Sequence, residues 1–183
     1  MNNTNWKIAE QSKQKLGEAL LTVMEVYDYR EITITQVAQE AGLSRKTFYR
    51  LFSDKDSVLS YIFESLFAEC FSLIQIQKIE HYWDLVQLYF DFWEERKKLL
   101  SLLQKNSLLP RVIEYTYQHS MVVFEQLRSR EEMYTVSAQL PYLLAYSIGG
   151  MHSMLLKWIE MGMNIPSSEL IHQLRTGFMS PDI

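Results

Sequence analysis

The sequence has few of the residues that build disulfide-rich, zinc-binding or catalytic proteins. Its 183 residues include one cysteine, Cys70, with 6 glycines and 4 prolines. No disulfide can therefore form within the chain, and no cysteine–histidine cluster has the spacing of a structural zinc site. The four histidines are scattered, and neither a His-Glu-x-x-His motif, a Gly-x-Ser-x-Gly motif nor a phosphate-binding loop is present. These absences predict no catalytic, metal or cofactor site and favour an intracellular protein.

A signal peptide and a membrane span are also not expected. Residues 1–10 are polar, and no apolar segment with a cleavage site follows them. Residues 133–156 carry no formal charge and are long enough to span a membrane, but they include Gln139, Pro141 and His152. We therefore predict a buried helix in that region and a cytoplasmic protein. Cys70 lies on an apolar stripe, which favours core packing over redox sensing.

The charge is divided unevenly along the chain. The net charge is −4, with 48% hydrophobic and 22% charged residues, an ordinary globular balance. Residues 1–60 hold eight basic and eight acidic residues, whereas the remainder holds ten basic and fourteen acidic ones. Four basic residues and one acid fall between Arg45 and Lys55. A local basic surface can therefore hold phosphates although the whole chain is acidic.

Residues 35–55 have the pattern of two short helices joined by a tight turn. We predict the first helix over about 36–41, capped by Thr35 and ended by Gly42, and the second over about 45–52, capped by Ser44. In the second helix Phe48, Leu51 and Phe52 suit burial. The residues expected to face outward are cationic, hydroxylic or aromatic: Arg45, Lys46, Thr47, Tyr49 and Arg50.

Such an outward face suits the phosphates and base edges of DNA. An ordinary helical hairpin with a solvated basic face is the alternative interpretation. The small residues Ala38 and Gly42 and the short connection match the spacing of a DNA-binding helix-turn-helix, and they favour DNA binding.

These motifs resemble the N-terminal pattern of the TetR/AcrR family of bacterial transcription regulators. The matching segments are Thr35, Val37-Ala38, Ala41-Gly42-Leu43-Ser44, Thr47-Phe48-Tyr49 and Phe52-Ser53-Asp54-Lys55. The resemblance covers about the first third of the chain. It implies an all-α fold with a three-helix helix-turn-helix DNA-binding domain over 1–52, joined to a helical-bundle effector-binding and dimerisation domain over 53–183.

The resemblance also implies the positions that contact DNA. Thr35 would hold phosphate, Gln36 would lie near the groove edge, Arg45 would contact a base and Tyr49 both a base and the backbone. Lys46 stands where the family often has glycine, and Leu51 where it often has a phosphate-binding histidine or tyrosine. The full expected set is Thr35, Gln36, Ser44, Arg45, Lys46, Thr47, Tyr49, Arg50 and Lys55, with Lys55 against a phosphate.

The rest of the chain has helical periodicity. We expect helices over about 6–27, 53–77, 81–104, 108–130, 131–161 and 167–178, with Ser53 and Asp56 forming a capping box at the second of these. Residues 96–98 are either a helix break or a solvated face, and we favour the solvated face. The pair Gly149-Gly150 costs helix stability, so close packing against another helix should offset it.

The body is rich in large aromatic residues, and core packing is the default role of each. In the resembled family the body encloses a small-molecule cavity, and side chains that could orient a ligand there are Trp83, Tyr89, Trp93, Tyr115, His119, Tyr142, Tyr146 and His152. The family's last two helices form a dimer interface, here about 133–178. Burial of that region within one monomer is the alternative.

The sequence thus predicts a homodimeric regulator that binds a palindromic double-stranded operator and represses transcription until an unidentified small-molecule effector shifts the helix that starts near residue 53. Two alternatives stay open. The body could dock a partner protein, which would make the chain a co-activator or a subunit of a larger regulator. The chain could also be an uncommon helical enzyme carrying a DNA-like hairpin.

Overall fold

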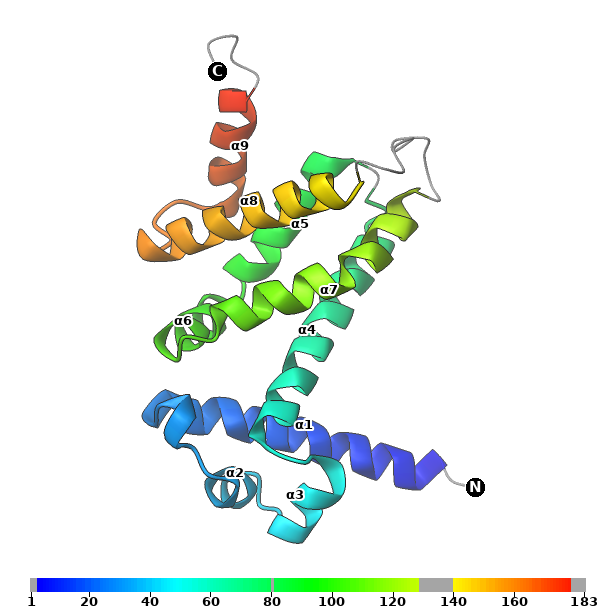
Figure 1. Cartoon of the computed structure of the whole chain (residues 1–183), viewed down its shortest axis with the longest axis vertical. Coiled ribbons are helices and arrows are strands. Elements are labelled where there is room, and N and C mark those ends of the chain that lie inside the picture. The colour runs from blue at the N-terminus through cyan, green and yellow to red at the C-terminus, as the bar shows by residue number, and fades with distance from the viewer. Residues whose placement is uncertain (1–2, 80, 129–139, 179–183) are drawn as a thin grey trace. The chain divides into compact units, whose positions relative to one another are not determined.

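The computed structural model describes residues 3–79, 81–128 and 140–178, and over those residues it is helical without a strand (Figure 1). The first half of the chain forms α1 (Asn3–Val26), the 3-10 turn η1 (Tyr29–Glu31), α2 (Ile34–Glu40), α3 (Arg45–Leu51) and α4 (Lys55–Ile76). The second half forms α5 (Tyr82–Glu94), α6 (Lys97–Lys105), α7 (Leu109–Arg128), α8 (Leu140–Glu160) and α9 (Ser167–Phe178). The predicted all-α fold is confirmed.

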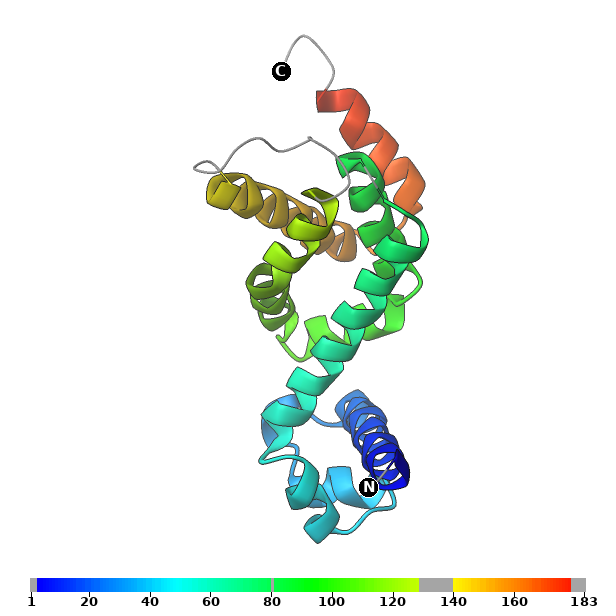
Figure 2. The ribbon, with the colours of Figure 1, turned by 90° about the vertical axis from the view of Figure 1, so that its right-hand side faces the viewer.

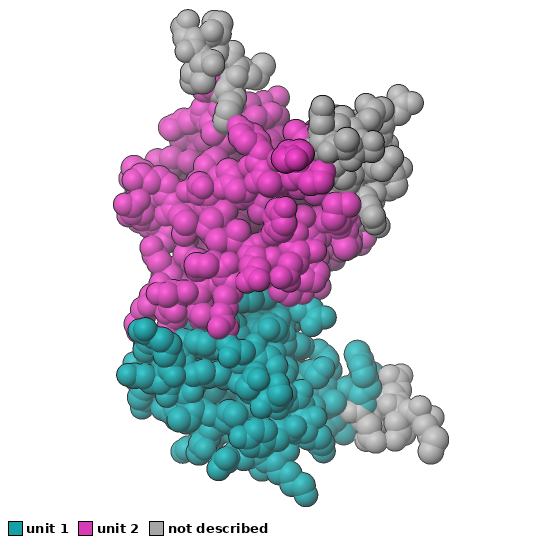
Figure 3. Space-filling view, viewed as in Figure 1, with its two compact units in different colours: residues 1–66 teal, residues 67–183 magenta. Residues whose placement is uncertain are grey.

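The chain divides into two compact units within α4, one of residues 1–66 and one of residues 67–183 (Figure 3). Each unit has a hydrophobic core of its own. In the first unit α2 and α3 pack against α1, and the fully buried side chains come from all four helices: Leu16, Leu20, Met24, Val37, Phe48, Val58 and Leu59. The functional boundary expected after residue 52 stays a prediction.

Helix α1 is the longest helix of the first unit and packs against α2 and α3. Leu16, Leu20 and Met24 recur at helical spacing and are fully buried. Apolar residues at helical spacing continue in the sequence from Ile8 to Tyr27, but Ile8 is 52% exposed and Tyr27 is 46% exposed. Among the described side chains of α1, the buried ones all lie between residues 16 and 24, in the second half of the helix, so the pattern overestimates the buried length.

The first turn of α4 is capped by a different pair from the one expected. The Asp54 carboxylate accepts a hydrogen bond from the Ser57 amide at 2.7 Å, and the Ser57 hydroxyl accepts one from the Asp54 amide at 3.2 Å. The Ser53 hydroxyl is bonded to the Asp54 carboxylate instead. The capping box is therefore one residue later than predicted, because an aspartate and a serine fill the two roles as well as the expected pair does.

Among the described residues, one helix, α4, is long and apolar enough to cross a membrane by length and composition. Its first half contributes Val58, Leu59, Ile62 and Phe63 to the core of the first unit. One such helix is weak evidence for a membrane span, because core helices of folded domains pass the same test.

Residues 81–104 were expected to form one helix, but the structure breaks them into α5 and α6. Arg96 lies at the break, with φ −112° and ψ 30°. Its guanidinium donates to the carbonyl oxygen of Phe92 at 2.9 Å and pairs with Glu69 of α4. The guanidinium also lies 3.8 Å from the centre of the Phe92 ring. The preference for a continuous solvated face at 96–98 was wrong, because Arg96 makes contacts that need the chain to turn.

In the second unit α5 packs against α9, and α7 packs against α8 (Figure 2). Phe90 of α5 meets Trp158 of α8 edge to face, with ring centroids 5.8 Å apart. The buried hydroxyl of Ser167, at the start of α9, lies between carboxylate oxygens of Asp91 and Glu94. These contacts hold the end of α8 and the start of α9 against α5. Of the helix expected over 131–161, residues 131–139 lie outside the described part.

Candidate nucleic-acid interface

The first helix of the predicted helix-turn-helix starts two residues earlier than expected. Thr33, and not Thr35, is the N-cap of α2, and its hydroxyl accepts a hydrogen bond from the Gln36 amide at 3.3 Å. The Gln36 side chain completes a capping box by accepting from the Thr33 amide at 2.8 Å. Thr35 consequently lies exposed in the first turn, and the Gln36 side chain is held over that turn. The predicted cap at Thr35 was wrong.

The turn between α2 and α3 has the chemistry that the sequence predicts. Gly42 has φ +64°, a left-handed conformation that suits glycine, and no heavy atom lies within 4 Å of the place where its Cβ would be. The Leu43 amide then donates to the carbonyl oxygen of Ala38 at 2.9 Å. These bonds close α2 and direct the chain into α3.

Helix α3 divides into a buried and an exposed face, as predicted. Ser44 caps the helix, since its hydroxyl accepts from the Thr47 amide at 3.0 Å and lies 2.9 Å from the Thr47 hydroxyl. Phe48 is fully buried, while Tyr49 next to it is 52% exposed. Arg45, Lys46 and Arg50 are exposed as well. The hydroxyls of Ser44 and Thr47 are bonded to each other at the N-cap of α3. The cations and Tyr49 are therefore the exposed groups that remain for an external partner.

The three cations of α3 form no ion pair within the part of the chain that the structure describes. Arg45, Lys46 and Arg50 extend from a seven-residue helix that has no acidic residue in its first turn. A surface of this kind gains most from phosphate oxygens, which replace water around otherwise unpaired cations. The contacts that Thr35, Gln36 and the α3 residues make with DNA stay predictions.

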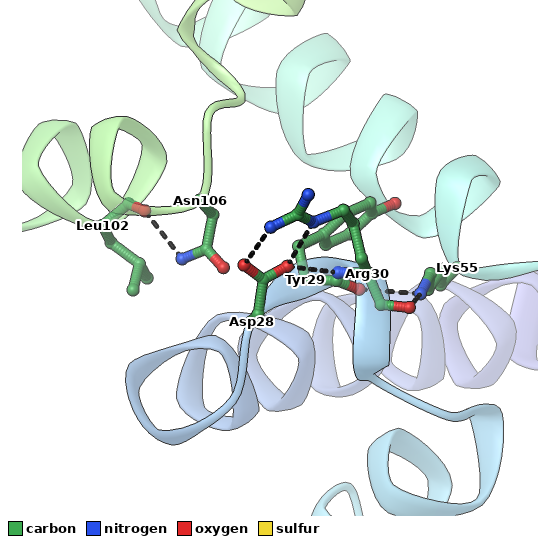
Figure 4. Close-up of polar contacts among 6 residues, drawn as sticks. All are labelled: Asp28, Tyr29, Arg30, Lys55, Leu102 and Asn106. Atoms are coloured by element: carbon green, nitrogen blue, oxygen red, sulfur yellow. Dashed lines mark hydrogen bonds and ion pairs between the residues drawn. The ribbon is translucent and has the colours of Figure 1, made fainter.

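Lys55 lies at the first position of α4, but its ammonium group is turned onto the protein (Figure 4). It donates to the carbonyl oxygens of Tyr29, Arg30 and Ile32 at 2.7, 3.0 and 3.0 Å. Close by, Asp28 accepts from the Arg30 amide and side chain, and this hydrogen bonding lowers the pKa of Asp28 to about 2. All three ammonium hydrogens therefore have acceptors in this structure, and the expected Lys55–phosphate contact stays a prediction.

Two of the predicted ligand-binding residues lie together in the second unit. The rings of Tyr115 and His119 stack in α7 with centroids 4.0 Å apart, and Phe67 of α4 lies 5.3 Å from the His119 ring. His119 Nδ1 is 2.8 Å from the Tyr115 carbonyl oxygen, so Nδ1 carries a proton and Nε2 accepts hydrogen bonds when the ring is neutral. All three side chains are partly buried.

Tyr89 and Trp93 form a second pair on α5. Their ring centroids lie 6.4 Å apart, and Trp93 is buried. Burial raises the pKa of the Tyr89 phenol above its usual range, and a hydrogen bond with Trp93 opposes that shift. Cys70 is packed against the buried cluster of Ile74 and Leu88, and burial raises the pKa of its thiol to about 11. This setting agrees with the preference for core packing over redox sensing.

The other predicted ligand residues do not join one site. Trp83 packs on Tyr82 at 5.5 Å, and His152 is half-buried with its pKa lowered by desolvation. Tyr142 and Tyr146 are 78% and 67% exposed on α8. Because so much of both rings is exposed, neither lines a closed cavity within the described chain.

Sequence reasoning missed three groups that shape this region. Thr33 and Asp54 cap α2 and α4, and Tyr29 donates its hydroxyl proton to Asp56 at 2.8 Å. The spacing of Thr33 and Gln36 is itself a capping-box signal that could have located the first cap. No local signal identifies the Tyr29–Asp56 contact, because 27 residues separate its partners.

Comparison with known proteins agrees with the helical architecture and the helix-turn-helix geometry. Residues 17–62 match the family model described as bacterial regulatory proteins, tetR family, and residues 80–179 match the model of a transcriptional regulator C-terminal region. A segment of 65 residues is 32% identical to the HTH-type dhaKLM operon transcriptional activator DhaS of Lactococcus lactis subsp. lactis (strain IL1403). That segment covers 36% of this chain and 35% of the relative, so the similarity spans about a third of each protein.

The second family model covers more than half of the chain, and the first covers α2, α3 and the start of α4. Among the described residues no group of three or more histidine, cysteine, aspartate or glutamate side chains could hold a metal ion. The exposed cationic helix α3 lies within the segment that matches the tetR family model. The chain belongs to the TetR family of bacterial transcription regulators, which are DNA-binding proteins and not enzymes.

Proposed function

We propose that the protein is a ligand-responsive repressor that binds a palindromic operator as a homodimer, with α3 of each copy in the major groove. The observation that carries the proposal is the exposed face of α3. Arg45, Lys46, Tyr49 and Arg50 are exposed there, the three cations have no acidic partner in the described ranges, and Phe48 anchors the helix in the core. Arg45 reads a guanine edge, Tyr49 contacts a base and the backbone, and Lys46 and Arg50 bind phosphates.

Thr35 and Gln36 complete this interface from α2. Thr35 is exposed in the first turn, where its hydroxyl and the free amides of the helix start suit a phosphate. The side-chain oxygen of Gln36, Oε1, already accepts hydrogen bonds in the capping box. The side-chain nitrogen, Nε2, is therefore the group left for DNA. Footprinting on DNA upstream of its own gene tests the arrangement. Two symmetric protected half-sites, about 34 Å or one helical turn apart, are expected, and protection of a single half-site would contradict the homodimer.

The proposed dimer interface is centred on α8. Tyr142, Tyr146 and Leu156 are exposed there, and nothing lies within 4 Å of where a Cβ on Gly149 or Gly150 would be. These positions share one helix face, and two glycines allow the backbone of a second helix to approach closely. Of the interface expected over 133–178, residues 133–139 lie outside the described part.

The dimer is tested by a charge placed on this face. Tyr146→Glu should convert the dimer to a monomer in sedimentation equilibrium, because it buries a carboxylate between two copies. Tyr117→Glu on α7 is a matched control, since Tyr117 is 49% exposed and lies on another helix. A Tyr146→Glu protein that stays dimeric, or loss of the dimer in Tyr117→Glu instead, would refute the interface.

The proposed effector site is the cluster of Phe67, Tyr115 and His119. It combines partly buried aromatic rings with a histidine Nε2 that accepts hydrogen bonds, which suits a flat ligand with a donor group. Helix α4 supplies Phe67 to this cluster and Lys55 to the first unit. A ligand that binds one position of α4 better than another would shift operator affinity by the same free energy.

Compounds found to raise the thermal unfolding temperature of the wild type should be tested next on operator binding. We expect at least one to lower operator affinity, with Phe67→Ala and His119→Ala abolishing both effects. Equal operator affinity with and without every bound compound would refute ligand control.

A second candidate is that the body docks a partner protein, as in a co-activator or a regulator subunit. The observation that favours it is the exposed apolar set on α7, which comprises Tyr117, Met121 and Val122. The partly similar relative carries the name of an activator, which also makes activation the second candidate for the sign of regulation. A reporter fused to the operator decides the sign: deletion of the gene should raise expression for a repressor and lower it for an activator.

A further inference from the structure

The Lys55 ammonium group is the most completely bonded cation among the described residues of the first unit. Its three N–H groups face three carbonyl oxygens. Those of Tyr29 at 2.7 Å and Arg30 at 3.0 Å are drawn in Figure 4, and the third is that of Ile32 at 3.0 Å. An ammonium group has three donors and no acceptor, so this set uses its full capacity. A lysine that binds a DNA phosphate needs at least one of these donors for the phosphate oxygen.

Tyr29 is held by α4 through its side chain as well as its carbonyl oxygen. The Lys55 nitrogen lies 4.9 Å from the centre of the Tyr29 ring, and the Tyr29 hydroxyl donates to Asp56 at 2.8 Å. Tyr29 itself is only 5% exposed. The first two residues of α4 thus bind the aromatic ring, the hydroxyl and the backbone of one buried residue.

These contacts lie directly before the start of α2. The three carbonyl oxygens belong to the connection between α1 and α2, and Ile32 is followed directly by Thr33, the N-cap of α2. Ile32 is 4% exposed, so its backbone cannot be moved without moving core side chains. Helix α2 then packs on α3, which presents the DNA-contacting face.

We propose that Lys55 is a positioning residue for DNA binding, which fixes the α1–α2 connection to the first turn of α4 and thereby sets the presentation of α2 and α3, and that it does not bind a phosphate. The chemistry argues for this role directly. A phosphate contact would take at least one ammonium donor from its carbonyl oxygen, and the carbonyl oxygens of Tyr29 and Ile32 are partly buried. The Tyr29 oxygen would keep the Ile32 amide, at 3.4 Å. Lys46 has no competing partner among the described residues.

Salt dependence separates a positioning lysine from a phosphate-binding one. Each protein–phosphate contact contributes about 0.9 to the slope of log affinity against log salt concentration on B-DNA. Lys46→Met and Lys55→Met remove the same charge and retain an unbranched side chain. We expect Lys46→Met to make the slope shallower by about 0.9 for each phosphate that it no longer binds. Lys55→Met should leave the slope unchanged and reduce affinity at least about tenfold at every salt concentration, corresponding to about 1.4 kcal/mol.

The conservative variant supplies the second readout. Lys55→Arg retains donors at the end of a long side chain and should recover part of the affinity that Lys55→Met lacks, again at the wild-type slope. A Lys55→Met slope that becomes shallower by the same amount as that of Lys46→Met would overturn the proposal. Wild-type affinity in Lys55→Met would overturn it equally.

The wild-type protein provides a test that does not depend on the folding of a variant. With ¹⁵N-labelled lysine, nuclear magnetic resonance reports the hydrogen exchange and chemical shift of each ammonium group. We expect the Lys55 ammonium hydrogens to exchange slowly in the free protein and their signal to stay in place when operator DNA is added, while the Lys46 signal moves. A Lys55 signal that exchanges as fast as that of Lys46, or that moves with it on DNA addition, contradicts the proposal.

The inference rests on DNA binding through α3, and the two can fail separately. If the wild type binds no duplex in the salt series, the proposed operator binding fails, while the exchange of the Lys55 ammonium hydrogens in the free protein still decides whether Lys55 holds the α1–α2 connection. If the wild type binds specifically and Lys55→Met reduces the slope, the operator binding stands and the positioning role fails.

Discussion

Phe48 and Tyr49 are neighbours in α3, yet substitution of each should damage a different property of the protein. Phe48 is fully buried, and replacing a buried phenylalanine with alanine costs about 3–5 kcal/mol of folding free energy. The compact first unit comprises residues 1–66, and at about 0.05–0.15 kcal/mol per residue its total stability is about 3–10 kcal/mol. Phe48→Ala should therefore remove a third or more of it, or unfold the unit outright.

Tyr49→Ala serves as the matched control. Tyr49 is 52% exposed and contacts Phe48 edge to face at 5.7 Å, a contact worth about 0.5–1.5 kcal/mol. Alanine has a higher helix propensity by about 0.5 kcal/mol, which offsets part of that cost. The net cost should be below about 1 kcal/mol, while removal of the ring that contacts a base and the backbone should reduce operator binding.

Hydrogen exchange followed by mass spectrometry measures both variants in the intact chain. Peptides from α2 and α3 should exchange much faster in Phe48→Ala than in the wild type, whereas peptides from α5 should not change, because that helix belongs to the other unit. In Tyr49→Ala the α2 and α3 peptides should exchange almost as in the wild type. Wild-type protection in Phe48→Ala would refute the assignment of α3's buried face.

Three further substitutions or modifications test single contacts. Urea titration should show that Asp54→Ala lowers the free energy of unfolding of the first unit by about 1 kcal/mol, because Asp54 caps α4. Ser53→Ala should lower it by less than about 0.5 kcal/mol, since Ser53 does not cap the helix. The reverse order would contradict the capping box of Asp54 and Ser57. Cys70 should react with iodoacetamide far more slowly in the folded protein than in urea at about pH 7.5, because burial raises the pKa of its thiol to about 11. In the folded protein the reaction should become faster as the pH rises toward that value. Equal rates in the folded and unfolded states would show that the thiol is not protected. Ser167→Ala should destabilise the second unit by about 1–3 kcal/mol, because the carboxylates of Asp91 and Glu94 lose the hydroxyl that lies between them. Ser168→Ala, at an exposed position, is the control. Equal urea midpoints for the two variants would contradict this role of Ser167.

The sequence predicted the helix-turn-helix well because its signals are local. Gly42 has the left-handed conformation expected of it, Ser44 caps α3, and Phe48 and Phe52 are buried. Each of these follows from backbone preferences or from helical spacing within a few residues. The cap of α2 was missed by two residues because Thr33 and Thr35 are chemically alike, and only the position of Gln36 distinguishes them.

Long-range contacts account for most of what the sequence did not reveal. Arg96, at the break after α5, pairs with Glu69, which lies 27 residues earlier in the sequence. Lys55 has carbonyl partners 23 to 26 residues away, and nothing near it in the sequence announces them. On α8, periodicity marks an apolar face but does not reveal that Tyr142 and Tyr146 remain exposed in the single chain.

The central claim is that α3 reads DNA, and the most direct test is binding to the DNA upstream of its own gene across a salt series. The wild type should bind that DNA more tightly than random duplex, with a steep salt slope from its unpaired cations. The double variant Arg45→Ala, Tyr49→Ala should retain some salt-dependent binding through Lys46 and Arg50 but lose the preference for the specific sequence. A double variant that keeps the wild-type sequence preference would contradict the account.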